Sequence, residues 1–127
     1  MKKSEIFEEL LDKVAEVCEV KKESVINGAK LQAVVDARVL TVQYLRRIGL
    51  SYDDIAVIVI RKNTGEEFPP LTDIKKKSKS VEKMFDSYSR RCLESYAFCL
   101  MSSEIKEFCI KRYKEMYLSW MKMPPTI

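Results

Sequence analysis

The scarcity of chain breakers is the feature that most limits what this chain can fold into. Of its 127 residues only three are Gly and four are Pro. So few breakers favour long uninterrupted elements, and apolar residues that recur at three- and four-residue steps make those elements helices. Hydrophobic residues make up 46% and charged residues 33%, a balance typical of a folded domain. We therefore predict one all-α domain over residues 1–127.

The apolar periodicity predicts a compact bundle of five to six helices. Their approximate ranges are 4–19, 22–26, 31–48, 51–60, 80–101 and 103–121. Ser4 is the expected N-cap of the first helix, and Gly28 and Gly49 stand where left-handed C-terminal caps are wanted. Ser51, with Asp54 three residues later, resembles a capping box. Only three residues separate the helices on either side of Gly49, which is the tight connection of a helix-turn-helix corner.

The second half of the chain carries one clear break. Residues 61–72 contain Asn63-Thr64-Gly65 and Pro69-Pro70, both turn signals, and we predict an exposed loop there. The next helix should begin near Ser78 or Ser80, and Ser102-Ser103 should mark a corner. The two long C-terminal helices are expected to form a helical hairpin, which Pro124-Pro125 ends.

Several kinds of chemistry have no residues to support them. The chain contains no His, which removes the commonest general base and the commonest metal ligand. No Gly-rich phosphate loop is present. The cysteines lack zinc-site spacing, and Cys92 and Cys99 are expected to be small buried hydrophobic residues. All four are expected to be reduced thiols: Cys18, Cys92, Cys99 and Cys109. We predict no enzyme activity, no metal and no cofactor. Without an export signal or a membrane-length apolar run, we expect a cytoplasmic protein with no membrane partner.

The stretch Val34–Ala56 carries the best clue to function. Its motifs, in chain order, are Asp36-Ala37-Arg38, Tyr44-Leu45-Arg46, Leu50-Ser51 and Ile55-Ala56. This ordered set resembles the carboxy-terminal DNA-binding domain of the replication initiator DnaA, in the Trp-repressor-like group of helix-turn-helix folds. The resemblance implies a helix-turn-helix region over residues 1–92 that binds double-stranded DNA, in replication or transcription control. Residues 93–127 are then a C-terminal helical extension.

The resemblance also implies which residues contact DNA. The family's basic loop before the second long helix corresponds to Lys30 and Gln32 here. Arg38 matches an Arg of the family's helix, and its residue type alone fits a phosphate contact or a partner for an acid inside the bundle equally well. The family's recognition segment, Arg-Asp-His-Thr-Thr-Val, has no counterpart for its His. Lys79 and Ser80 stand where the two Thr stand.

A second candidate for the recognition segment begins at Arg61 and Lys62. The complete predicted DNA-binding set is Lys30, Gln32, Arg38, Arg61, Lys62, Lys75, Lys76, Lys77, Ser78, Lys79, Ser80 and Lys83. A helix start rich in Lys and Ser would offer cations, hydroxyls and backbone N–H groups to phosphates.

The distribution of charge leaves two functions open. Residues 74–91 hold seven basic and two acidic residues, a net +5, whereas residues 1–27 hold five basic and seven acidic ones, a net −2. Such asymmetry fits a face that binds a polyanion, although a solvated helix start would also produce it. The alternative to DNA binding is a helical interaction module that kept the fold, with a homodimer formed through the C-terminal helices.

Overall fold

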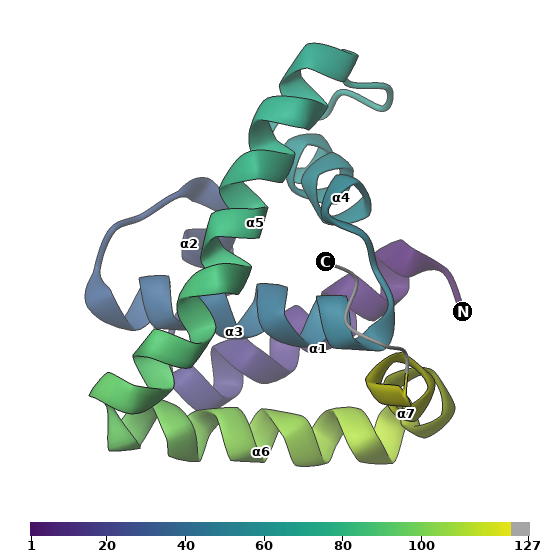
Figure 1. Cartoon of the computed structure of the whole chain (residues 1–127). Coiled ribbons are helices and arrows are strands. Elements are labelled where there is room, and N and C mark those ends of the chain that lie inside the picture. The colour runs from purple at the N-terminus through teal and green to yellow at the C-terminus, as the bar shows by residue number, and fades with distance from the viewer. Residues whose placement is uncertain (123–127) are drawn as a thin grey trace.

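The computed structural model describes residues 1–122, with the backbone alone for residues 119–122. This part of the chain is entirely helical apart from its connections, which confirms the all-α bundle (Figure 1). The helices are α1 (Lys3–Cys18), α2 (Lys22–Asn27), α3 (Gln32–Ile48), α4 (Tyr52–Thr64), α5 (Leu71–Glu94), α6 (Tyr96–Arg112) and α7 (Lys114–Lys122). The described residues thus form seven helices, where the sequence predicted five to six, because the last helix breaks at Tyr113.

Helix α3 is the centre of the bundle. It contacts every other described helix, and Figure 1 shows α1 behind it, α5 crossing in front and α6 running below. Ten of its 17 residues are buried, as expected for a helix covered on most sides. Helices α6 and α7 supply Ile105, Cys109 and Tyr117 to the same core, and Tyr113 between them does so as well. The described part of the predicted C-terminal extension is therefore packed into the bundle.

The short connection between α3 and α4 has the two helix caps that the sequence predicts. Gly49 has φ 119°, and its N–H donates to the carbonyls of Leu45 at 3.2 Å and Arg46 at 3.0 Å. A residue with a Cβ is strained at this φ, so glycine suits the position. The Ser51 hydroxyl accepts from the Asp54 N–H at 3.0 Å, and the Asp54 carboxylate accepts from the Ser51 N–H at 3.0 Å. The capping box is thereby confirmed.

The capping box makes a testable contribution to stability. We expect Ser51→Ala to lower the free energy of unfolding by about 1 kcal/mol, because the N–H of Asp54 loses its acceptor at the helix start. Urea denaturation followed by circular dichroism measures the change. Ser89→Ala is the matched control, since Ser89 is exposed and lies inside α5 rather than at a helix cap. A loss for Ser51→Ala no larger than for the control would contradict a stabilising cap.

The predicted loop at 61–72 is wrong at both ends. Helix α4 continues to Thr64, whose hydroxyl donates to the carbonyl four residues earlier at 2.8 Å, and Gly65 closes it with φ 76°. The Asn-Thr-Gly turn signal is thus the C-terminal cap of a helix. The connection shrinks to residues 65–70, because α5 begins at Leu71.

The predicted start of the next helix near Ser78 or Ser80 is also wrong, by seven residues or more. Pro70 occupies the N-cap position, and Ile74, Ser78 and Val81 keep one side of α5 covered. The lysines that read as a polar helix start are good helix formers, so they extend the helix toward its N-terminus.

The predicted corner at Ser102-Ser103 is wrong for a related reason. The chain turns at Ser95, whose hydroxyl accepts from the Phe98 N–H at 3.2 Å and caps α6. Ser102 lies inside α6, only 3% exposed, with its Oγ 2.6 Å from the Tyr44 hydroxyl and also bonded to that of Tyr88. Helices α5 and α6 diverge from their junction, so the predicted hairpin takes the form of an open corner (Figure 1).

The ends of α1 and α2 agree with the prediction only in part. Ser4 is not the N-cap of α1, because the helix begins at Lys3 and its N-cap, Lys2, makes no side-chain bond to the helix. Gly28 caps α2 with φ 86°, as predicted. The predicted stop at Pro124-Pro125 lies outside the described residues.

Candidate nucleic-acid interface

The lysines of α5 lie in its second to fourth turns and not at its first. Because the helix begins at Leu71, Ser78 and Ser80 lie inside it, with helical turns on both sides. The charged residue in the first turn is the acidic Asp73. The expected contact between a helix start at Ser78 and phosphate is therefore wrong. Any contact to DNA by this segment must come from side chains on the flank of the helix.

Three lysines of α5 share one exposed flank. Lys76, Lys79 and Lys83 are spaced at i, i+3 and i+7, which places them on the same side of a helix. All three are exposed, and none has an ion pair or hydrogen bond with the described residues. We call these three residues the α5 stripe. A shallow hollow lined by Leu71 and Thr72 adjoins its N-terminal end.

Lys75 points to a different neighbour. Its Nζ lies 2.9 Å from a carboxylate oxygen of Asp53 on α4. This bond, together with one from Ser78, holds the pKa of Asp53 below its usual value. Lys75 and Ser78 therefore tie α5 to the start of α4, and their polar groups have internal partners.

The second recognition candidate, at the end of α4, is also occupied. Lys62 pairs with Glu8 of α1, which in addition accepts from Lys22 at 2.8 Å. The bonds from Lys22 and then Lys62 hold the pKa of Glu8 below its usual value. Arg61 donates through Nε to the carbonyl of Glu67 at 2.6 Å. Both cations are thus bound to the protein's own acceptors.

Arg38 has a structural role that its residue type left open. Its guanidinium donates to three carbonyl oxygens: those of Val25 at 2.7 Å, Ala29 at 2.9 Å and Ser24 at 3.1 Å. These carbonyls belong to the last four residues of α2 and the connection after it, where carbonyls have no partner within the helix. Arg38 fixes α2 against α3, and its partners are carbonyl groups rather than the acid that was considered.

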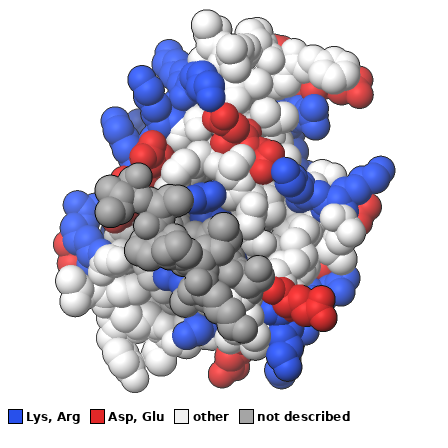
Figure 2. Space-filling view, turned by 45° about the vertical axis from the view of Figure 1, so that its right-hand side comes forward, with Lys and Arg blue, Asp and Glu red and all other residues white. Residues whose placement is uncertain are grey.

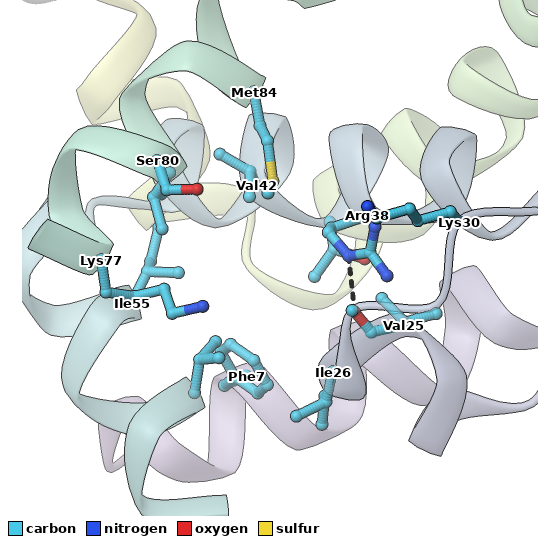
Figure 3. Close-up of a pocket in the computed structure, with 14 residues that line it drawn as sticks. Phe7, Val25, Ile26, Lys30, Arg38, Val42, Ile55, Lys77, Ser80 and Met84 are labelled. Carbon is cyan, nitrogen blue, oxygen red and sulfur yellow. Dashed lines mark hydrogen bonds between the residues drawn. The ribbon is translucent and has the colours of Figure 1, made fainter. Parts of the chain in front are cut away.

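One cavity brings together four of the predicted residues. Lys30, Arg38, Lys77 and Ser80 line a hollow of about 270 Å³ beneath α5 (Figure 3). Gln32 does not join them, because its amide bonds to Asp36 at 3.0 Å. Four predicted residues therefore line the cavity and three form the outward α5 stripe. The remaining five bond to other residues of the protein: Gln32, Arg61, Lys62, Lys75 and Ser78.

The apolar walls of that cavity were missed as a site. Phe7, Val42, Ile55 and Met84 come from four different helices and face one space. Their helical periodicity predicted buried positions, which is correct, but periodicity carries no signal for a gap between packed helices. Only the assembled bundle reveals that these side chains leave room.

Charged groups on one side of the surface are interspersed rather than gathered together. On the side seen in Figure 2, several groups of Lys and Arg are separated by Asp, Glu and uncharged residues. Some acids lie beside cations that they pair with, as Asp54 does with Lys3 at 3.0 Å. Any binding to a polyanion must therefore be local, on a stripe such as that of α5, and sensitive to salt.

The described residues offer no metal-binding cluster of three or more His, Cys, Asp or Glu side chains. Burial raises the pKa of the Cys18 thiol to about 11 and that of Cys109 to about 12. Thiols with raised pKa values react slowly, because the thiolate is the nucleophile. These two cysteines therefore act as packing residues.

The comparisons with known proteins do not identify a family. No family model, no curated protein and no solved structure matches this chain. The likeness to the DnaA carboxy-terminal domain, and the helix-turn-helix that it implies, therefore stay predictions from the motifs. Within residues 1–122, none of the helices has the length and apolar character needed to cross a membrane.

Proposed function

We propose that this chain is a non-enzymatic DNA-binding protein that contacts duplex phosphates through the α5 stripe. The observation that carries the proposal is the alignment of Lys76, Lys79 and Lys83 on one exposed flank without internal partners. Lys30 is exposed as well, and it lies on the side of the cavity opposite to α5. Cations that are free of intramolecular carboxylates are the ones available to phosphates.

The dimensions of the stripe suit a DNA groove. Seven residues of α-helix span about 10 Å, so the stripe is comparable in length to the width of the major groove, about 12 Å. Lysines spaced over that distance reach phosphates on its two edges. Such contacts position a protein without reading bases, and nothing in the stripe supplies a base-specific pairing. We therefore propose binding with little sequence preference.

A fluorescence anisotropy titration of a labelled random duplex tests the proposal. We expect micromolar affinity at 50 mM salt and, with three phosphate contacts, about a fortyfold weaker affinity at 200 mM. Absence of binding at 50 mM salt, or an affinity that salt does not change, would contradict the proposed function.

A second candidate function rests on a different surface. Leu93, Tyr96 and Leu100 at the corner between α5 and α6 are 89%, 79% and 53% exposed. Exposed apolar groups that lie together favour a protein contact, which fits an interaction or homodimer module. Light scattering distinguishes the candidates. A mass of 14.8 kDa at high concentration rules out the homodimer, and twice that mass, lost in a Leu93→Asp variant, favours it.

A further inference from the structure

The cavity beneath α5 is walled mainly by apolar side chains. Its volume is about 270 Å³, and it lies between α5 and helices α1 to α4 (Figure 3). Six of its walls are Phe7, Ile26, Val42, Ile55, Val59 and Met84. Six of the residues that line the cavity, among them Phe7 and Ile55, are less than 5% exposed, so the floor of the cavity is part of the core.

Cations stand on two sides of this apolar space. Lys77 extends its ammonium group into the cavity from α5, while Arg38 and Lys30 lie together on the opposite side (Figure 3). Lys77 is half-buried and has no ion pair with the described residues. The three bonds of Arg38 use Nε and Nη2, which leaves Nη1 outside them. No Asp or Glu is among the described residues that line the cavity.

This combination of charge and apolar wall is complementary to one class of ligand. An ammonium group that faces an apolar cavity without a carboxylate partner is available to an anionic headgroup, and a carboxylate placed beside it forms a charge-assisted hydrogen bond. The walls in turn favour an aliphatic tail over water. An apolar cavity of about 150 Å³ holds benzene, so at that density about 270 Å³ accommodates about ten carbons. An extended polyanion such as DNA does not fit into this space.

We infer that the cavity binds a free medium-chain carboxylate of about eight to ten carbons, with its headgroup between Lys77 and the Arg38–Lys30 side and its tail among the apolar walls. The inference goes beyond DNA binding and does not depend on it. Lys77 lies on a different flank of α5 from the stripe, since it follows Lys76 by one residue.

Isothermal titration calorimetry with octanoate tests the inference. We expect saturable binding of one octanoate per chain at submillimolar concentration. The same tail without charge, 1-octanol, should bind at least tenfold more weakly, and acetate, the charge without the tail, should give no saturable heat. Absence of saturable octanoate binding, or equal affinities for octanoate and 1-octanol, would overturn the inference.

Two variants and one control place the ligand. Lys77→Gln should weaken octanoate binding about tenfold, because it removes the charge and keeps most of the stem. Lys76→Gln, on the neighbouring position of the stripe, should leave binding unchanged. Val42→Phe should abolish binding by filling the cavity, while circular dichroism shows a retained helical fold. Equal effects of Lys77→Gln and Lys76→Gln would contradict the site. The duplex titration is separate, so failure of DNA binding and failure of ligand binding are distinguishable.

Discussion

Replacing Lys76, Lys79 and Lys83 together with Glu should weaken duplex binding by about a hundredfold or more at 50 mM salt. Each lysine is exposed and has no ion pair with the described residues, so each is available to a phosphate. The substitution removes three such contacts and adds three negative charges that phosphates repel. Helical structure should persist, because Glu is as good a helix former as Lys and the positions are exposed. Fluorescence anisotropy with a random duplex measures the loss.

A matched triple variant separates local contact from net charge. Lys106, Lys111 and Lys114 are exposed on α6 and α7, away from the first half of α5 in Figure 1. Changing these three to Glu alters the formal charge by the same amount, and we expect affinity to fall by less than threefold. If both triple variants lose affinity equally, the α5 stripe has no special role and binding reflects overall charge.

Arg38→Met should lower the free energy of unfolding by about 2–3 kcal/mol without changing DNA affinity. The variant keeps the apolar stem and removes a guanidinium that donates to three carbonyls between Ser24 and Ala29. A hydrogen bond from a charged donor contributes about 1.5–3 kcal/mol, and water recovers part of the loss at a half-buried position. Urea denaturation measures stability, and anisotropy well below the unfolding transition measures affinity.

The same pair of measurements decides between the two roles of Arg38. Lys106→Met is the control for exchanging an exposed cation, and it should change stability by less than 0.5 kcal/mol, roughly the range of surface substitutions. A stability loss for Arg38→Met below about 1 kcal/mol, accompanied by a tenfold loss of DNA affinity, would make Arg38 a phosphate contact rather than a residue that holds α2 on α3.

Local signals in the sequence predicted the elements that depend on local physics. Gly49 and the Ser51–Asp54 pair predict helix caps, because the hydrogen bonds of these caps join residues that are close in the sequence. Both caps form. The apolar residues of α3 agree with its central position, because a surface helix has a narrower apolar stripe. The boundaries of the second half failed because their signals have two meanings. A Gly after Asn-Thr ends a helix as readily as it makes a loop, and a run of lysines extends a helix as readily as it precedes one.

The sequence did not predict which serine ends a helix and which is buried: the chain turns at Ser95, and Ser102 lies inside α6. Both are serines flanked by helix-forming residues, and only the partners distinguish them. Ser102 is stabilised inside α6 by hydroxyls of Tyr44 and Tyr88 from two other helices. A polar residue is acceptable in a core when such partners satisfy it, and sequence alone does not supply them.

The candidate site divides in the same way. Spacing alone places Lys76, Lys79 and Lys83 on one flank, because helical periodicity fixes that relation once the helix is known. Arg38 could not be assigned, since its partners lie in α2 and in the connection after it. The cavity near Lys77 could not be predicted either, because it is a gap left by several helices in contact. Charged positions were thus predictable, and their pairing was not.

The most direct test of duplex binding by the α5 stripe is the salt dependence of affinity for the wild type and for the Lys76, Lys79 and Lys83 to Glu variant. We expect the plot of log affinity against log salt to have a slope of about −2.7 or steeper for the wild type, and a slope shallower by about 2.7 for the variant, as three lost phosphate contacts require. Parallel plots for the two proteins would contradict the claim that these lysines contact DNA.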